Sequence, residues 1–349
     1  MSWVRVIVWG LGAMGGGIAR MLLEKRGVEI VGAIERRPEL IGCDLGEVLG
    51  LGRRLGVEVS GDAESVLSRA RADVVLQATG SFVHEVESDI LLAVRHGCNL
   101  ISTAEEMACP QATNPDAAAR LDRAAREAGV SVFGTGINPG FVLDLLIIAL
   151  TAACRRVDSV TARRVNDLSP FGPTVMRSQG VGTTPEEFDR GVAAGAIVGH
   201  VGFQQSIRLI ADALGWRLDR VEERREPIIS KVARRAPHAT VEPGMVAGCN
   251  HTGIGYADGR AVITLLHPQQ IQPQAEGVLT GDYIEIEGDP PVRFSGSPEI
   301  PGGIGTMAVV VNYIPLVVAA RPGLLTLNDL PVPAARMGDM TLSRRGLAS

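Results

Sequence analysis

Residues 4–15 of this 349-residue chain read VRVIVWGLGAMG, and this stretch decides the fold of the first domain. Its apolar run, Val4–Trp9, predicts a buried β-strand, and the glycines that follow match the pattern G-x-G-x-x-G at the start of an amphipathic helix. Gly10 permits the tight turn, Gly12 lets a pyrophosphate approach the backbone, and Gly15 lets the helix pack closely on the strand. The positive end of the helix dipole then favours the phosphates. The stretch therefore predicts a dinucleotide-binding turn with the cofactor-contacting residues Gly10, Leu11, Gly12, Ala13, Met14 and Gly15.

The end of the second predicted strand, Val28–Ile34, carries the residues that select the cofactor. Glu35 follows it, 20 residues after Gly15, where a carboxylate accepts hydrogen bonds from the ribose 2′-hydroxyl of NAD. Arg36 and Arg37 come next, and their guanidinium groups either hold the 2′-phosphate of NADP or form an ordinary solvated turn. We therefore predict that the protein uses both NAD and NADP.

Short apolar runs and longer amphipathic runs alternate over residues 1–140. Further strands are predicted at Val74–Gln77, Asn99–Ser102 and Val130–Phe133, and helices at Met14–Lys25, Val83–Arg95 and Asp116–Ala128. This alternation is typical of a parallel sheet with right-handed crossovers and helices on both faces. The fold class is therefore α/β, with a doubly wound, parallel Rossmann sheet in the N-terminal domain.

The pattern changes after residue 140, and residues 141–300 predict a second, α/β (α+β) domain with a mixed or antiparallel sheet. Its predicted helices are Phe141–Ala153, Pro185–Ala193 and Phe203–Leu214, and its predicted strands are Ser159–Val165, Arg217–Glu223, Val246–Tyr256, Arg260–His267 and Tyr283–Glu287. Turn residues at 257–260 and 288–291 predict hairpins. Within residues 301–330 we expect an apolar helix, about Gly305–Ala319, that returns to the first domain. Residues 331–349 read as a polar tail.

Composition excludes several classes of function. The formal net charge is −5, so the chain has no overall basic field to hold nucleic acid or anionic lipid. The five cysteines show no C-x-x-C spacing, and His238, His251 and His267 show no metal-ligand spacing, so we assign no metal. The longest apolar stretches fall short of the roughly 20 residues of a membrane span. We expect a cytoplasmic protein without a membrane or nucleic-acid partner.

Two adjacent carboxylates follow the predicted strand Asn99–Ser102. Ligands of an open α/β sheet bind beyond the carboxyl ends of its strands, so Glu105 and Glu106 lie at the expected site edge. Adjacent side chains rarely point the same way, so at most one of them faces the site, where a carboxylate exchanges protons with an amine or activates water. The alternative is a helix N-terminus, where the dipole favours acidic residues.

Other strand ends supply further candidates. Thr79 and Gly80 follow Val74–Gln77 and are predicted to pass near the nicotinamide ribose, or else to form an ordinary turn. Asn138 lies at the domain junction and is predicted to contact the cofactor amide or the substrate. His200 is either a proton donor or a cap or interface residue.

Several motifs together resemble the 2,4-diaminopentanoate dehydrogenase family. They are residues 10–15, STAEE at 102–106, NPGF at 138–141, RVNDLS at 164–169, and GGIGT at 302–306 continuing through NYIP at 312–315. The family includes native NAD(P)-dependent amine dehydrogenases and is distantly similar to dihydrodipicolinate reductase. The resemblance covers nearly the whole chain, through the segment that ends at residue 333.

The resemblance implies a homodimeric enzyme that deaminates an amine reversibly to a ketone and ammonia with a nicotinamide cofactor. The amine is 2,4-diaminopentanoate-like or a simple alkyl amine. The catalytic glutamate maps to Glu105, with Glu106 as the fallback, and Asn312 joins the cofactor-binding residues. The substrate-pocket residues are Phe141, Arg164, Asn166, Met176, Arg177, His200, Phe203 and Thr306.

The expected mechanism gives these residues distinct roles. Glu105 takes a proton from the substrate ammonium, since only a neutral amine can expel a hydride. Phe141, Met176 and Phe203 exclude water from the hydride path. The residues expected to bind the rest of the substrate are Arg164 and Arg177, for a carboxylate, and Asn166 and His200, for orientation.

Three alternatives stay open at this point. An imine reductase of the dihydrodipicolinate type is disfavoured, because such relatives carry a paired histidine with a nearby lysine. This chain has no His-His pair, and its two lysines, Lys25 and Lys231, are not placed to serve. The others are a homoserine-dehydrogenase-like enzyme acting on a hydroxyl and a nicotinamide-sensing regulatory protein.

Overall fold

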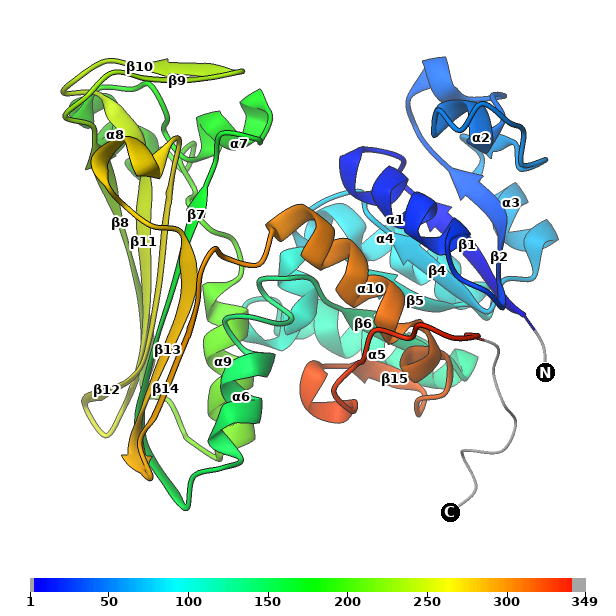
Figure 1. Cartoon of the computed structure of the whole chain (residues 1–349). Coiled ribbons are helices and arrows are strands. Elements are labelled where there is room, and N and C mark those ends of the chain that lie inside the picture. Colours follow the sequence, from blue (N-terminus) through cyan, green and yellow to red (C-terminus); the bar gives the residue numbers. More distant parts are fainter. Residues whose placement is uncertain (1–2, 341–349) are drawn as a thin grey trace. The chain divides into compact units, whose positions relative to one another are not determined.

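The structure, a computed structural model, describes residues 3–340 (Figure 1). The chain divides into two compact units, one formed by Met1–Phe141 with Gly302–Ser349 and the other by Val142–Pro301. Each unit contains its own sheet. The first unit is thus built from both ends of the sequence.

The sheet of the first unit has seven parallel strands in the order β15-β6-β5-β4-β1-β2-β3. They are β1 (Val4–Trp9), β2 (Val28–Ile34), β3 (Val59–Ser60), β4 (Val74–Gln77), β5 (Asn99–Ser102), β6 (Ser131–Gly134) and β15 (Gly323–Leu325). This is the doubly wound Rossmann order with one added edge strand, and its switch point lies between β1 and β4. The predicted α/β fold class is therefore confirmed.

Helices cover both faces of this sheet (Figure 1). The helices of this unit are α1 (Ala13–Leu23), α2 (Leu45–Val48), α3 (Ala63–Ala70), α4 (Val83–Arg95), α5 (Pro115–Ala128) and α10 (Gly302–Val318), with short 3-10 turns at Pro38–Leu40, Glu105–Ala108, Pro110–Ala112 and Leu327–Asp329. Helix α10 contacts α1 directly. At Gly17 of α1 a Cβ atom would lie 2.3 Å from the Cε of Met307, so glycine permits this close approach.

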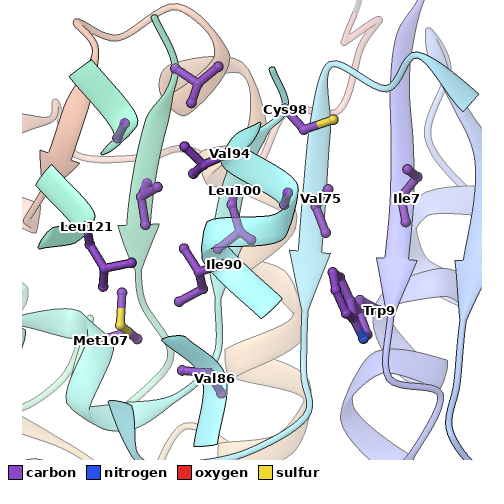
Figure 2. Close-up of a cluster of buried hydrophobic side chains, with 14 of the residues drawn as sticks. Ile7, Trp9, Val75, Val86, Ile90, Val94, Cys98, Leu100, Met107 and Leu121 are labelled. Carbon is purple, nitrogen blue, oxygen red and sulfur yellow. The ribbon is translucent and has the colours of Figure 1, made fainter. Parts of the chain in front are cut away.

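A large apolar cluster lies on the opposite face, under α3, α4 and α5. Figure 2 shows Ile90 and Val94 of α4 beside Leu100 of β5, with Ile7 and Trp9 of β1 in the same layer. Because successive strand residues point to opposite faces, the other β1 side chains face the layer that holds α1 and α10. Burial of both faces explains why these strands read as continuous apolar runs.

The second unit contains a six-stranded mixed sheet in the order β14-β13-β7-β12-β11-β8 and a separate two-stranded sheet. The strands are β7 (Arg156–Asp167), β8 (Arg220–Ile229), β9 (Arg234–Ala236), β10 (Ala239–Val241), β11 (Val246–Ala257), β12 (Arg260–Gln270), β13 (Gly281–Asp289) and β14 (Val292–Gly296). Only β7 and β12 pair in parallel in the large sheet. The predicted mixed sheet is confirmed.

The helices of the second unit are α6 (Leu145–Thr151), α7 (Pro173–Ser178), α8 (Pro185–Ala193) and α9 (Phe203–Leu214), with a 3-10 turn at Pro273–Glu276. Helices α6 and α9 contact each other, and α9 packs on β11 and β12. Gly253 of β11 leaves the space that Phe203 fills, since a Cβ there would lie 2.9 Å from the phenyl ring.

Several predicted boundaries are wrong. The helix expected at Phe141–Ala153 starts at Leu145, because residues 141–144 form a turn and Asp144 caps the helix through the Leu145 amide. The strand expected at Arg217–Glu223 is β8, which starts at Arg220 and runs to Ile229. The short strand β15 was not predicted.

The predicted tail is only partly described. Residues 331–340 are mostly exposed, but Met340 is buried and its amide bonds to the Arg26 carbonyl. Residues 341–349 of that tail lie outside the described residues. Within 3–340, no helix is both long enough and apolar enough to span a bilayer.

Candidate functional site

The turn between β1 and α1 has the backbone that the glycine pattern predicts. Gly10 has a φ of +90°, and a Cβ there would lie 2.5 Å from the Ala78 carbonyl oxygen. At Gly15 a Cβ would lie 1.8 Å from the Gly10 oxygen. At Gly12 a Cβ would meet nothing within 4 Å, and no side chain caps α1. The amino end of α1 therefore faces open space of the kind that a pyrophosphate requires.

A cavity of about 310 Å³ lies beside this turn. Its lining residues are Trp9, Gly10, Gly12, Glu35, Arg36, Arg37, Ala78 and Thr79. The Glu35 carboxylate accepts hydrogen bonds from the amides of Leu11 (2.8 Å), Arg36 (2.8 Å) and Arg37 (3.1 Å). Burial acts to raise the pKa of Glu35, but these bonds and the Arg37 guanidinium outweigh it and hold the pKa below its usual value. Glu35 is thus a fixed carboxylate at the predicted ribose position.

A second cavity of the first unit, about 290 Å³, holds Glu105. Its lining residues are Met14, Ala78, Gly80, Ser81, Thr103, Glu105, Gly136, Ile137, Asn138, Pro139 and Thr306. Burial raises the pKa of Glu105 to about 7, and the nearby charges of Glu85 and Glu106 act in the same direction. A carboxyl group with this pKa exchanges protons readily at neutral pH.

Glu106 has a different environment. Its Oε2 accepts hydrogen bonds from the Val83 amide (2.8 Å) and the Asn114 side chain (3.1 Å). Val83 is the first residue of α4, so Glu106 satisfies a free amide at the helix N-terminus. The two alternatives for this pair of acids therefore apply to different residues: Glu105 faces the cavity, and Glu106 caps a helix.

Hydrogen bonds join the segments around the cavity that holds Glu105. The Gln77 amide donates to Thr79 Oγ1 (3.0 Å), and Ser102 donates to Gln77 Oε1 (2.7 Å), so the ends of β4 and β5 are tied together. Thr306 Oγ1 accepts from the Ile137 amide (3.1 Å), which ties α10 to the segment after β6. Segments remote in sequence are thereby bonded to one another at this cavity.

The predicted cofactor residues fall mostly around these two cavities. Thr79 lines the first cavity, and Met14, Gly80 and Asn138 line the second. Asn312 lies half-buried on α10 and is not among the residues that line either cavity. Of the predicted pocket residues, Thr306 lines the cavity with Glu105, and Phe141 lies in the turn that follows.

Arg164 of the second unit is committed to protein partners. Its side chain is 2% exposed, its Nη1 lies 2.6 Å from Asp282 Oδ1, and its Nη2 donates to the Ile300 carbonyl. Asp282 Oδ2 accepts from the Ile300 amide (2.9 Å), which closes a ring between β7, β13 and the segment after β14. Both ends of the guanidinium are thus buried and bonded to protein groups in this structure, which points to a structural role, and the binding of a substrate carboxylate by Arg164 stays a prediction.

The other predicted pocket residues of this unit differ in exposure. Met176 is buried in an apolar cluster with Leu168 and Ile271, whereas Arg177 is exposed on α7. Asn166 is 7% exposed, and its Oδ1 has no hydrogen-bond partner among residues 3–340. Phe203 is 1% exposed, so it supports the surrounding side chains and presents almost no surface of its own to a ligand.

A buried histidine cluster surrounds His200. Its ring lies 4.9 Å from that of Phe203 and 5.0 Å from that of His267, and its amide donates to Nδ1 of His251 (3.0 Å). His251 in turn bonds to Glu223 (3.0 Å). Burial, with His251 and Arg164 nearby, lowers the pKa of His200 to about 3. The imidazole is thus neutral at physiological pH, which argues against its predicted role as a proton donor.

Sequence reasoning missed this cluster, although a signal for it exists. The predicted hairpin turn at 257–260 lies midway between residues 251 and 267, and the structure pairs His251 with His267 across that hairpin. Counting back from the turn places His251 opposite Leu266, and a register shift between Gly255 and Tyr256 brings it opposite His267. Among residues 3–340 no group of three or more His, Cys, Asp or Glu side chains is placed to hold a metal ion.

Comparisons with known proteins agree with the motifs. The family described as 2,4-diaminopentanoate dehydrogenase C-terminal domain matches residues 141–345, and the dihydrodipicolinate reductase N-terminus matches residues 4–105. A 2,4-diaminopentanoate dehydrogenase from Acetoanaerobium sticklandii is 51% identical over 342 residues, which cover 97% of this chain and 96% of that protein. An amine dehydrogenase from Streptomyces virginiae is 28% identical over 364 residues, 95% of this chain and 97% of that protein.

A solved structure is similar over nearly the same length. The amine dehydrogenase from Mycobacterium smegmatis has a TM-score of 0.84 and 32% identity, and covers 96% of this chain and 98% of that chain. The resemblance drawn from the motifs is therefore confirmed. On the matched C-terminal domain and the relative at 51% identity, this chain belongs to the 2,4-diaminopentanoate dehydrogenase family.

Proposed function

We propose that this enzyme catalyses the NAD(P)-dependent oxidative deamination of an amine, reversibly, to a ketone and ammonia. The amine is 2,4-diaminopentanoate-like or a simple alkyl amine, in keeping with the names of the relatives. The observation that carries the proposal is Glu105, a carboxyl group with a pKa of about 7 on the wall of a cavity that also contains Met14 of the dinucleotide turn. The homodimer and the cytoplasmic location stay predictions.

The first unit has residues that fit a nicotinamide dinucleotide. The amides at the start of α1 and the open space at Gly12 suit the pyrophosphate, and the fixed carboxylate of Glu35 suits a ribose hydroxyl. Gly80 and Asn138 line the cavity of Glu105 and would hold the nicotinamide end. When bound, the cofactor supplies a hydride acceptor for the amine-bearing carbon.

Glu105 accepts the proton that the substrate nitrogen must lose before the hydride can depart. Its carboxylate accepts a proton from the substrate ammonium, so that the nitrogen lone pair becomes available to form the C=N bond of an imine as the hydride departs. The protonated Glu105 can then return its proton to the leaving ammonia while water adds to the imine carbon. The net change is substrate ammonium, water and oxidised cofactor to ketone, ammonium, reduced cofactor and one proton released to solvent.

Apolar residues of the same cavity limit the access of water. Met14, Ile137 and Pro139 line it together with Glu105. Low polarity around the carboxyl group keeps its pKa close to neutral and strengthens its interaction with an ammonium group. Phe141, Met176 and Phe203 keep their proposed role in shaping the substrate pocket.

The test is a screen for NAD(P)H consumption with ketones and keto acids, with and without ammonium. We expect oxidation of the reduced cofactor to require ammonium, because the amine nitrogen comes from ammonia in the reductive direction. Reduction of a cyclic imine without ammonium would instead indicate an imine reductase, and alcohol oxidation without ammonia release would indicate a hydroxyl dehydrogenase. Cofactor binding without any turnover would indicate a sensor.

Cofactor use gives a second expectation. Because Glu35 suits a ribose hydroxyl while two arginines adjoin it, both NAD and NADP should support turnover. The measurement is kcat/KM for each cofactor at a saturating amine concentration. A preference beyond about a thousandfold, roughly 4 kcal/mol, for either cofactor would contradict dual use.

A further inference from the structure

Arg36, beside the predicted ribose site, is bonded to an acidic residue from a remote helix. Its Nη2 lies 2.8 Å from Oδ1 of Asp89, which lies on α4. The two side chains differ sharply in exposure, since Arg36 is 69% exposed and Asp89 only 7%. Asp89 Oδ2 is buried and has no hydrogen-bond partner among the described residues. Arg36 is therefore the cation on which a buried carboxylate depends.

The neighbouring arginine is paired as well. Arg37 Nη2 lies 3.1 Å from Glu35 Oε2 and donates to the Leu11 carbonyl (2.9 Å). The cavity of about 310 Å³ thus has two arginines on its wall, each paired with a carboxylate. The four charges sum to zero, so this wall is less favourable to an anion than the sequence, with its two adjacent arginines, indicates.

We propose that Asp89 is a positioning residue that sets cofactor choice through Arg36. It holds the guanidinium against α4 and adds a negative charge near the place of a 2′-phosphate, so that NAD is favoured over NADP within the dual use described above. The inference rests on the proposed function, because it requires a nicotinamide dinucleotide in this cavity.

Movement of Arg36 toward a phosphate has an energetic cost. It would leave the Asp89 carboxylate buried without a partner on either oxygen, and an unpaired buried charge is strongly unfavourable. Burial raises the pKa of Asp89, and Arg36 opposes that rise, so the carboxylate relies on this arginine to stay ionised. A neutral residue at position 89 removes both the cost of an unpaired buried carboxylate and the repulsion between that carboxylate and a 2′-phosphate.

The test is the Asp89→Asn variant, with the affinities for NADH and NADPH measured by titration calorimetry without an amine. We expect the dissociation constant for NADPH to fall about tenfold, equivalent to 1.4 kcal/mol, while that for NADH changes little. Asp89→Ser should shift the ratio in the same direction and keeps the test open if the Asn variant does not fold. Asp89→Glu, which retains the charge, should keep a ratio close to that of the wild type.

Two control variants separate positioning from other effects. Glu87→Gln removes a negative charge from the same helix, but Glu87 pairs with Arg120 (2.8 Å) and not with Arg36, so the cofactor ratio should not change. Adding Arg36→Met to Asp89→Asn should abolish most of the gain in NADPH affinity, because Arg36 is then absent.

The outcomes that oppose the inference are distinct from those that oppose the proposed function. An unchanged NADPH-to-NADH ratio in Asp89→Asn, or an equal loss of affinity for both cofactors, would overturn the role of Asp89 and leave the amine chemistry intact. Wild-type protein that binds neither cofactor would overturn the proposed function and this inference with it.

Discussion

Glu105→Gln is expected to lower turnover by about a hundredfold or more while leaving the affinity for NAD(P)H unchanged. The amide has the shape of the carboxyl group but cannot accept the ammonium proton. The variant should therefore bind cofactor and substrate without removing the proton that blocks hydride departure. Steady-state kinetics with an amine, together with calorimetric titration of NADH, measures both quantities.

The pH profile provides an independent readout of the same residue. Since burial raises the pKa of Glu105 to about 7, kcat/KM for amine oxidation should rise with pH through about 7 in the wild type, as the active carboxylate forms. In the reductive direction the protonated form is the donor, so the corresponding limb should fall with pH. In Glu105→Gln the pH dependence near 7 should be absent in both directions of the reaction.

Stability distinguishes a catalytic defect from a folding defect. A carboxyl group whose pKa is raised in the folded state favours folding at pH values below its unfolded pKa, and this contribution is lost as the pH rises toward 7. Above pH 7 the buried carboxylate opposes folding, so Glu105→Gln should unfold at the same or higher urea concentration than the wild type. A less stable variant would leave its low turnover open to a structural explanation.

Glu106→Gln is the matched control. Glu106 caps α4 through the Val83 amide, so its replacement should reduce the free energy of unfolding by about 1 kcal/mol and change turnover little. If instead Glu105→Gln kept full turnover and Glu106→Gln lost it, the proton transfer would belong to Glu106.

Arg164→Met should be the most destabilising of the substitutions considered, lowering the free energy of unfolding by about 3–5 kcal/mol. The substitution keeps an unbranched side chain but leaves Asp282, 3% exposed, as an unpaired buried carboxylate. It also removes the donor to the Ile300 carbonyl. Urea unfolding of the variant, compared with the wild type, measures the loss.

The double variant Arg164→Met with Asp282→Leu tests the cause. Replacing both charges with apolar residues removes the unpaired carboxylate, so most of the lost stability should return. A loss below about 1 kcal/mol in the single variant, combined with a selective rise in KM for keto acids over ketones, would contradict the structural role. That result would support the role that the resemblance implied, in which Arg164 binds the substrate carboxylate.

The first unit was largely predictable from the sequence. The strands β1, β2, β4 and β5 have the predicted bounds, because a parallel strand buried on both faces reads as a short apolar run between turn residues. The strand β15 was missed, since three residues beside β6 give no periodicity. Its position depends on pairing across the sheet and not on local pattern.

The second unit was less predictable. Arg164 illustrates the reason, because an arginine in an alternating strand reads as exposed or functional until its partner is known. That partner, Asp282, lies 118 residues away on β13. The same limit applies to Arg36, which bonds to Asp89 over a separation of 53 residues. The turn appears basic in the sequence, but this distant carboxylate neutralises the charge of Arg36.

The position of the candidate carboxylate was predictable from the sequence, whereas its catalytic role stays a prediction. Sequence placed a carboxylate at the end of β5 but did not separate Glu105 from Glu106, because the choice depends on a 3-10 turn that begins at Glu105. In that turn one side chain enters the cavity while the next reaches the first amide of α4. Local propensity carries little information about such a short turn.

The discontinuous first unit has a consequence for biosynthesis. Helix α10 and Thr306 are translated only after the whole of Val142–Pro301, so a nascent chain bearing all of β1–β6 still lacks the helix that packs on α1. A prematurely terminated polypeptide that ends before Gly302 lacks Thr306, which lines the same cavity as Glu105. Ribosomal errors in this gene product should therefore yield fragments without deaminating activity, rather than partially competent enzymes.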